Sequence, residues 1–244
     1  MSLRRSPQPR PRPPHISASV LNADFAQLGA EVRRAVSGGV DSIHLDVMDG
    51  HFVDNITMGP VVVEAVRSAS SVPYHAHLMI SEPLRYAGRF AEAGSDVVVF
   101  HLEADDDPAA VIRAIRDAGR SPGLAINPET PAAAATPWLE QVDMLLVMTV
   151  RPGWGGQEFM HEVLPKVAEL RAEADRRGLD LPIGVDGGVG LDTIGPAYAA
   201  GGDVLVTGTA LYRNPGDLSE VVDGLKAAAR EGLQPIPTPE RSRS

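Results

Sequence analysis

Short apolar runs alternate along this chain with stretches whose apolar residues recur at helical spacing. In chain order, the apolar runs are Ile16–Leu21, Ser42–Met48, Tyr74–Ile80, Asp96–Leu102, Pro122–Ile126, Asp143–Val150, Leu181–Asp186 and Asp203–Thr207. Phe25, Leu28 and Val32, after the first run, have the spacing of one helix face. Glycines such as Gly38 and Gly39 close these stretches, as they commonly close helices. The pattern therefore predicts strands and helices in strict alternation.

Strands that are apolar on both faces and are joined by helices indicate a parallel sheet. Eight such units in about 220 residues predict an α/β fold, a single (β/α)8 barrel, which we place at residues 15–232. An open, doubly wound sheet is the alternative. Its glycine-rich turn should follow the first strand, but Val20-Leu21-Asn22-Ala23-Asp24 occupies that place.

The two ends of the chain have a different composition from the middle. Residues 1–14 and 233–244 are rich in proline and charge and poor in apolar residues, which predicts disordered tails. A basic interaction arm is the alternative interpretation of the first tail. This N-terminal segment has no apolar core, so it is not a secretory signal, and we expect a cytoplasmic protein.

Composition limits the chemistry and the partners. The 244 residues include no cysteine and carry a formal net charge of −10. Thiolate chemistry is therefore excluded, and binding to nucleic acid or to a membrane is not expected. A small anionic substrate remains compatible, because backbone amides can hold a phosphate. We expect a homo-oligomer, although no outer helix face shows a diagnostic apolar stripe.

The buried run Ser42–Met48 contains two ionisable residues, His44 and Asp46. Alternation along a strand places His44, Asp46 and Met48 on one face. An imidazole and a carboxylate in a dry interior are costly unless they are paired, neutralised or bound to a metal. A satisfied core pair and a functional site are both compatible with this strand alone.

The other strands offer partners for this pair. The active site of such a barrel lies at the carboxyl ends of the strands. There the spacing places four candidate ligands for one divalent metal ion, Zn, Fe, Mn or Co, per subunit: His44, Asp46, His77 and Asp186. His75 is a rival ligand that would lie one pleat deeper, and His77 could instead be a core histidine. We expect His101 to brace the site and Asp49 to order the loop that follows it.

Three glycine-rich turns follow the last three strands. They are Gly153-Trp154-Gly155-Gly156, Gly187-Gly188 and Gly208-Thr209. Glycine lets backbone N–H groups approach a phosphate closely, and loops after strands seven and eight commonly bind phosphate in these barrels. The turns therefore predict a phosphate site. Near the strand ends we also expect an apolar collar made by Met48, Met79 and Met148.

These parts allow several reactions. Two carboxylates on opposite sides of a substrate can act as an acid and a base, while a metal polarises a carbonyl and stabilises the enediolate formed by deprotonation. Return of the proton to the opposite face gives an epimerase, and return to the adjacent carbon gives an aldose–ketose isomerase. Cleavage of a C–C bond is a third outcome. A Schiff-base aldolase is not expected, because no predicted strand contains lysine.

The chain also resembles a known family. The motifs S-V-L-N-A-D-F, H-L-D-V-M-D-G-H-F-V, N-I-T-M-G, H-L-M, F-H-L-E-A, P-G-W-G-G-Q-x-F, V-D-G-G-V and V-T-G-T-A-L-Y are similar, in this order, to those of ribulose-phosphate 3-epimerases. The resemblance covers about residues 15–230. It implies a metal-dependent (β/α)8 isomerase of the pentose phosphate pathway and the Calvin cycle, which interconverts D-ribulose 5-phosphate and D-xylulose 5-phosphate.

The resemblance also implies roles for residues of this chain. Asp46 and Asp186 match the acid/base pair, and together with His44 and His77 they match the metal ligands. The positions that match substrate and phosphate contacts are Ser19, His77, Gly153, Trp154, Gly155, Gly156, Asp186, Gly187, Gly188, Gly208 and Thr209.

The chain departs from the family pattern at a few positions and leaves two alternatives open. The departures are Ala18 for proline, His75 for aspartate, Arg151 for asparagine or glutamate, Trp154 for phenylalanine and Thr209 for serine. None of them removes a proposed ligand or base. The alternatives are a 3-epimerase of a ketohexose 6-phosphate such as allulose 6-phosphate, and a non-catalytic barrel that binds sugar phosphates.

Overall fold

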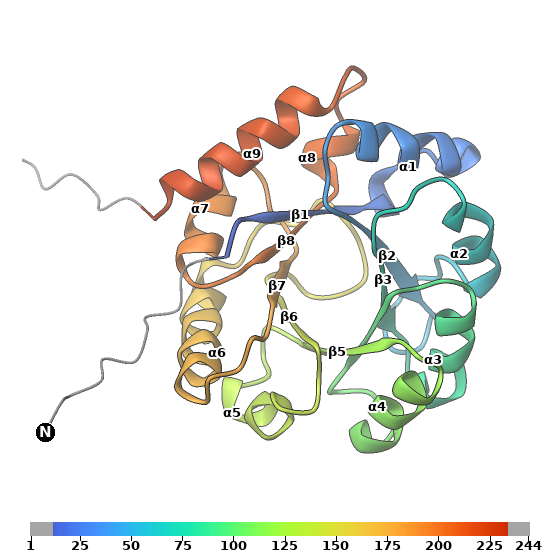
Figure 1. Cartoon of the computed structure of the whole chain (residues 1–244), viewed down its shortest axis with the longest axis vertical. Coiled ribbons are helices and arrows are strands. Elements are labelled where there is room, and N and C mark those ends of the chain that lie inside the picture. Colours follow the sequence, from blue (N-terminus) through green and yellow to red (C-terminus); the bar gives the residue numbers. More distant parts are fainter. Residues whose placement is uncertain (1–11, 234–244) are drawn as a thin grey trace, which may run out of the picture.

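A closed parallel barrel is the frame of the molecule. The computed structural model describes residues 12–233, and the predicted tails fall outside this range except at residues 12–14 and 233. Looking into the barrel, Figure 1 shows the strands in the middle with the helices around them. The strands are β1 (His15–Ser19), β2 (Ser42–Met48), β3 (Tyr74–Met79), β4 (Val97–His101), β5 (Ser121–Ile126), β6 (Met144–Met148), β7 (Ile183–Asp186) and β8 (Val204–Thr207).

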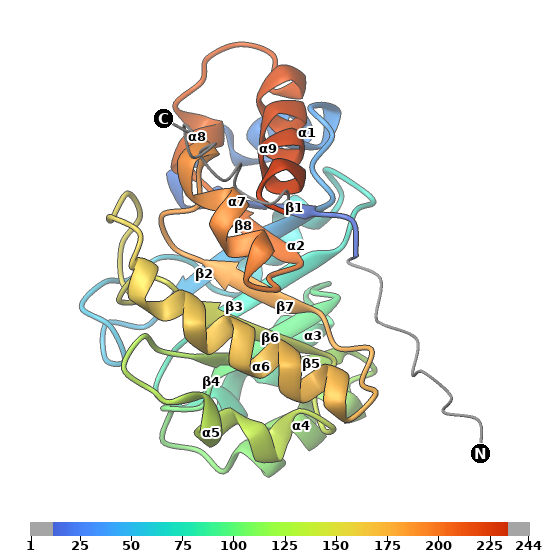
Figure 2. The same ribbon diagram turned by 90° about the vertical axis from the view of Figure 1, so that its left-hand side faces the viewer.

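Each strand pairs in parallel with the next one in the sequence, and β8 pairs with β1 to close the barrel. The predicted (β/α)8 architecture is thus confirmed, and the open doubly wound sheet is wrong. The helices are α1 (Leu28–Ser37), α2 (Pro60–Arg67), α3 (Pro83–Glu92), α4 (Pro108–Asp117), α5 (Ala132–Ala135), α6 (Leu164–Arg176), α7 (Leu191–Ala199), α8 (Thr209–Tyr212) and α9 (Ser219–Glu231). Figure 2 shows α6, α7 and α9 lying along the outside of the strands. Within residues 12–233, no helix combines the length and apolar composition needed to cross a bilayer.

Two kinds of buried layer follow from the alternation of side chains along the strands. Outward-facing residues such as Ile43, Leu45 and Val47 belong to the large apolar cluster shared with the helices. Inside the barrel, a second apolar cluster comes from β4, β5, β6 and β8 and includes Leu146 and Val206. The buried polar residues lie instead mainly on β1, β2 and β3. One side of the barrel interior is therefore apolar and the other is polar.

The ends of some strands differ from the prediction. The first strand ends at Ser19, and Val20–Asn22 form a 3-10 turn. Ser19 stabilises this turn because its hydroxyl accepts a hydrogen bond from the Leu21 N–H at 3.4 Å. Local capping thus competes with extension of the strand. The turn brings the Asn22 side chain to the mouth of the barrel, where it contacts Thr209 at 3.3 Å.

Candidate active site

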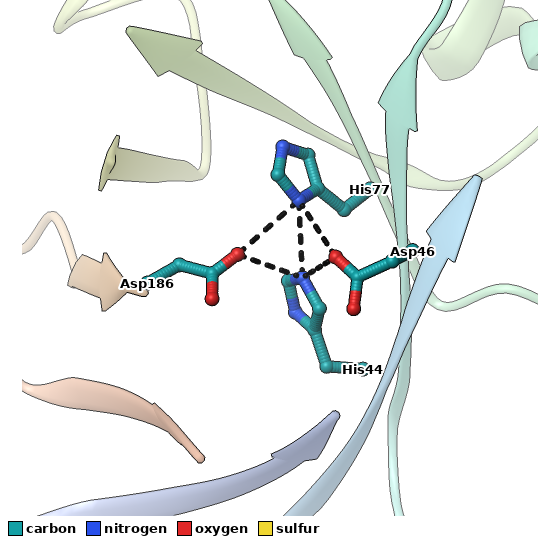
Figure 3. A group of neighbouring side chains, drawn as sticks. All are labelled: His44, Asp46, His77 and Asp186. Atoms are coloured by element: carbon teal, nitrogen blue, oxygen red, sulfur yellow. Dashed lines mark hydrogen bonds and ion pairs between the residues drawn. The ribbon is translucent and has the colours of Figure 1, made fainter. Parts of the chain in front are cut away.

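Four side chains from three strands meet inside the mouth of the barrel. His44 and Asp46 come from β2, His77 from β3 and Asp186 from the end of β7. Their side chains point toward one another, as Figure 3 shows. The register explains the meeting, because Asp46 lies beside His77 on the neighbouring strand. The two histidines are fully buried, and Asp46 and Asp186 are 4% and 8% exposed.

The spacing of the four ligand atoms suits a metal ion. His44 Nε2 lies 3.2 Å from His77 Nδ1. Asp46 Oδ1 lies 3.3 and 3.2 Å from these two nitrogens, and Asp186 Oδ2 lies 3.4 Å from each of them. A regular tetrahedron with edges of about 3.3 Å has its centre about 2.0 Å from each corner, which matches Zn–N and Zn–O bonds. The two carboxylate oxygens also lie within 4.8 Å of one another. This His/Asp group could therefore hold a metal ion.

The electrostatics of the group also favour a cation. Burial by itself lowers the pKa of His44, but the Asp46 and Asp186 carboxylates beside it raise that pKa to about 10. The pKa of His77 is also raised, because hydrogen bonds to the same two carboxylates outweigh burial. Burial raises the pKa of Asp46 and Asp186, whereas the two imidazoles lower it more strongly. The two carboxylates thus attract positive charge to the point between the four side chains.

The rival ligand His75 lies outside this group. Its ring stacks against His15 lower in the barrel, with 6.1 Å between the ring centroids. Burial lowers the pKa of His75 to about 3, so it is a neutral core histidine. The tertiary structure therefore brings His77, and not His75, to His44 and Asp46.

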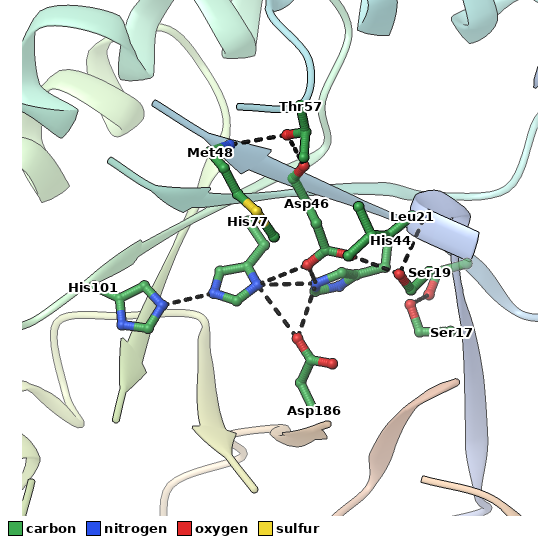
Figure 4. A network of polar contacts seen from close by, with 11 residues as sticks. Ser17, Ser19, Leu21, His44, Asp46, Met48, Thr57, His77, His101 and Asp186 are labelled. Atoms are coloured by element: carbon green, nitrogen blue, oxygen red, sulfur yellow. Dashed lines mark hydrogen bonds and ion pairs between the residues drawn. The ribbon is translucent and has the colours of Figure 1, made fainter. Parts of the chain in front are cut away.

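A second layer of contacts fixes these side chains, as Figure 4 shows. The Ser19 hydroxyl donates a hydrogen bond to Asp46 Oδ2 at 2.6 Å. Thr57 fixes the backbone of β2 near Asp46, because its hydroxyl donates to the Asp46 carbonyl and accepts the Met48 N–H. His101 Nε2 lies 2.9 Å from His77 Nε2, which agrees with its expected bracing role. Asp46 is thereby held with one oxygen toward the imidazoles and the other toward Ser19.

A cavity of about 290 Å³ opens above the His/Asp group. Asp46 and Asp186 line it, whereas His44 and His77 lie beneath it. The residues of the three predicted phosphate turns also line it: Gly153, Trp154, Gly155, Gly156, Gly187, Gly188, Gly208 and Thr209. So do Ser19 and the three methionines of the predicted collar, Met48, Met79 and Met148. The structure thus brings every residue of the predicted site to one cavity or directly below it.

Sequence reasoning gave no role to several residues that shape this site. Asn22 lies between two glycine turns, since a Cβ added at Gly155 or at Gly208 would come within 3 Å of its side-chain oxygen. Gln157 orders the turn before it, because its amide donates to the carbonyls of Arg151 and Trp154 at 2.7 and 2.9 Å. The place of Gln157 directly after the two glycines was the signal for this role. For Asn22 the signal was weaker, since an asparagine near a strand end is common.

Comparisons with known proteins agree with this geometry. Residues 15–212 match the model of the ribulose-phosphate 3 epimerase family. A ribulose-phosphate 3-epimerase of Bacillus subtilis is 47% identical over 198 residues, which are 81% of this chain and 91% of that protein. One from Escherichia coli is 38% identical over 213 residues, 87% of this chain and 94% of that protein. A 3-hexulose-6-phosphate synthase structure from Salmonella typhimurium has a TM-score of 0.64 at 18% identity, covering 89% of this chain and 99% of that one. This last likeness shows the fold alone.

Proposed function

The chain belongs to the ribulose-phosphate 3 epimerase family, and we propose that its Asp46 and Asp186 move the proton at C3 of D-ribulose 5-phosphate. It is an epimerase of the isomerase class, and D-xylulose 5-phosphate is the proposed product of this reversible reaction. The observation that carries the mechanism is the position of the two carboxylates. Both line one cavity, and they come from β2 and β7 with the two imidazoles between and below them.

The proposed reaction uses one carboxylate as a base and the other as an acid. One aspartate removes the C3 proton, and the electron pair moves toward the C2 carbonyl to give an enediolate. The other aspartate then delivers a proton to the opposite face of C3, which inverts this carbon. In the reverse direction the two aspartates exchange roles. Because the carboxylates share hydrogen-bond partners, they titrate as a coupled pair.

Ser19 and the buried walls support the proton transfers. Ser19 fixes the Asp46 carboxylate by donating to Oδ2 at 2.6 Å, so the base needs little reorganisation as the proton moves. Met48, Met79 and Met148 supply apolar walls that limit the access of water to C3. The three glycine turns offer backbone N–H groups to the phosphate at the other side of the cavity.

We further propose that the His/Asp group holds one divalent ion per subunit. Two imidazoles and two carboxylates suit Zn, Fe, Mn or Co. An ion bound there would polarise the C2 carbonyl and offset the negative charge that deprotonation leaves on the substrate. A homo-oligomer and a cytoplasmic location remain predictions.

A substrate comparison tests the proposed function. We expect turnover of D-ribulose 5-phosphate with a kcat/KM well above that for D-allulose 6-phosphate, measured with the metal-loaded protein. A clear preference for the hexose phosphate would contradict the proposed substrate. Absence of turnover with both sugars, while both bind, would instead indicate a non-catalytic barrel. Treatment with a chelator should abolish activity, and restoring a divalent metal should recover it.

A further inference from the structure

A chain of hydrogen bonds runs from His77 away from the cavity. The nitrogen of His77 that faces Asp46 and Asp186 is Nδ1, and its other nitrogen, Nε2, lies 2.9 Å from His101 Nε2. His101 Nδ1 in turn lies 3.2 Å from Glu103 Oε2. The first part of this chain is visible in Figure 4. The chain connects β3 to β4 and to the residues that follow β4.

The Glu103 carboxylate, the last group in this series of hydrogen bonds, can only accept hydrogen bonds. Glu103 Oε1 accepts the backbone N–H of Asn127 at 2.8 Å and also contacts the Thr130 hydroxyl. Lys166 fixes this loop, because its ammonium donates to the carbonyls of Asn127 and Pro128 at 2.9 and 2.7 Å. A carboxylate has no proton to give, so the hydrogen bond between Glu103 and His101 must use a proton on His101 Nδ1.

Because His101 donates to Glu103, the donor and the acceptor of the hydrogen bond between His101 and His77 are also fixed. In a neutral imidazole one nitrogen donates and the other accepts. With its proton on Nδ1, His101 can only accept at Nε2, so the proton between the two rings belongs to His77 Nε2. When a metal ion takes the place of the proton that His77 Nδ1 otherwise shares with Asp46 and Asp186, Nδ1 supplies the lone pair that binds the metal, while Nε2 keeps its proton. His44 differs, since its outer nitrogen Nδ1 is buried without a hydrogen-bond partner among the described residues.

We propose that Glu103 and His101 are positioning residues that set the tautomer and the orientation of His77, so that its Nδ1 is presented to the metal. The inference rests on the proposed metal centre and adds to it. Both residues lie outside the cavity lining, so they act through His77 and do not touch the substrate. Partners of this kind on metal-binding histidines typically contribute 10–100-fold in metal affinity or activity.

Glu103→Gln is the informative variant. It keeps the shape of the side chain but exchanges donor and acceptor in each hydrogen bond from residue 103 to His77. The amide oxygen would take the place of Oε1 facing Asn127 N–H and Thr130, which leaves the amide NH2 toward His101. His101 would then accept at Nδ1 and donate from Nε2, and His77 would carry its proton on Nδ1, where the metal should bind. We expect the Kd for Zn²⁺ to rise 10–100-fold, measured by competition with a chromophoric chelator on the metal-free full chain. A change below about 3-fold in the folded variant would overturn the proposal.

Two controls separate this effect from a general disturbance. Thr130→Val also removes a hydrogen bond from Glu103 but leaves the donors and acceptors between Glu103, His101 and His77 unchanged. The Kd for Zn²⁺ should therefore stay within about 3-fold. Asp203→Asn removes a buried carboxylate from Arg171 at the opposite ends of the strands, and it should leave the Kd unchanged. In a His101→Phe background, Glu103→Gln should have no further effect, since Glu103 would have lost its hydrogen-bonded connection to His77 through His101. An equally large further loss there would contradict the relay.

A measurement on the unmodified protein avoids any doubt about folding. With nitrogen-15-labelled histidine in the Zn²⁺-loaded full chain, NMR should show His101 neutral with its proton on Nδ1. A proton on Nε2 of His101 instead would overturn the proposal. Failure of the underlying metal centre gives a different result, because wild type and His77→Ala would then bind Zn²⁺ equally.

Discussion

At the scale of single residues, position in the barrel decides which of several similar side chains join the candidate site. His75 and His77 share one face of β3, yet His75 stacks on His15 while His77 contacts both aspartates. Asp46 and Asp49 lie on the same segment of the chain, and only Asp46 lines the cavity. The same residue type therefore lies at the candidate metal site, packs in the core or orders a loop according to its position in the barrel.

The proposed proton transfers predict the effect of removing either carboxylate. Asp46→Asn and Asp186→Asn each take away a group that accepts or donates the C3 proton. We expect kcat to fall by about 10²–10⁴-fold or more, and exchange of the C3 proton with deuterated water to become undetectable by NMR. Asp96→Asn, at the amino end of β4, should leave exchange unchanged. Normal exchange in either active-site variant would exclude the mechanism with two carboxylates.

Asp49 has a structural role with a pH dependence of its own. Its Oδ1 accepts the N–H groups of His51 and Phe52 at 2.8 Å each, and its Oδ2 accepts that of Ser81 at 2.9 Å. Although burial raises the pKa of Asp49, these three hydrogen bonds lower it below its usual value. The structure thus agrees with the loop-ordering role expected for this residue.

The lowered pKa of Asp49 fixes the sign of its contribution to stability. The contribution is complete above the unfolded-state pKa of about 3.9 and is lost as the pH falls through the lower folded-state pKa. We expect Asp49→Asn to lower the free energy of unfolding at pH 7 by about 1–3 kcal/mol. Urea unfolding at several pH values should show this difference shrinking below about pH 4. A difference that is independent of pH would assign the effect to packing.

At the scale of elements, the turns after the strands carry the site. Gly187 and Gly188, after β7, have φ values of 115° and 68°, which favour glycine. Gly188 also lies against the chain of the preceding loop, because an added Cβ would come within 2.8 Å of Phe159 N. This turn therefore needs glycine for both its conformation and its space.

Gly119→Ala provides a matched comparison for Gly188→Ala. Gly119, at the end of α4, has a similar φ of 72°, but no atom lies within 4 Å of its added Cβ. We expect Gly119→Ala to cost about 1–2 kcal/mol from the backbone conformation alone. Gly188→Ala should cost about 1–3 kcal/mol more from overpacking and raise KM for the sugar phosphate, because Gly188 lines the cavity. Equal losses in thermal unfolding and unchanged KM would argue against this account of the turn.

At the scale of the whole molecule, the barrel interior is divided between packing and chemistry. The apolar cluster from β4, β5, β6 and β8 fills one side, while β2, β3 and β7 bring the four candidate ligands together. A formal net charge of −10 does not oppose an anionic substrate, because the proposed phosphate contacts are local backbone amides.

A metal held by three strands should stabilise the entire barrel. Binding only to the native state adds about 2.7 kcal/mol at a free metal concentration of 100 times Kd. For a protein of this size, that energy raises Tm by roughly 5–11 °C. Calorimetry with and without a divalent metal should show this rise, and it should vanish in His77→Ala. A rise of equal size in that variant would place the stabilising ion elsewhere.

Much of this architecture follows from the sequence alone. Apolar runs at regular intervals, each followed by helical spacing and glycine, determine the strands and helices because burial on both faces requires continuous apolar residues. The same alternation places His44 and Asp46 on one face of β2, and the glycine-rich turns identify the side of the barrel that carries the site. The motifs around these residues also indicate the family.

Only the tertiary structure decides which distant residues meet. The register of β2 and β3 places His77 beside Asp46, and Asp186 at the end of β7 completes the group of four by contacting both imidazoles. Glu103 contacts Asn127 and Thr130, and Asn22 contacts Thr209. These partners lie far along the chain, so local pattern could not reveal them. Ser19 ends its strand earlier than its apolar neighbours predict, because its hydroxyl caps the next turn and fixes Asp46 at the same time.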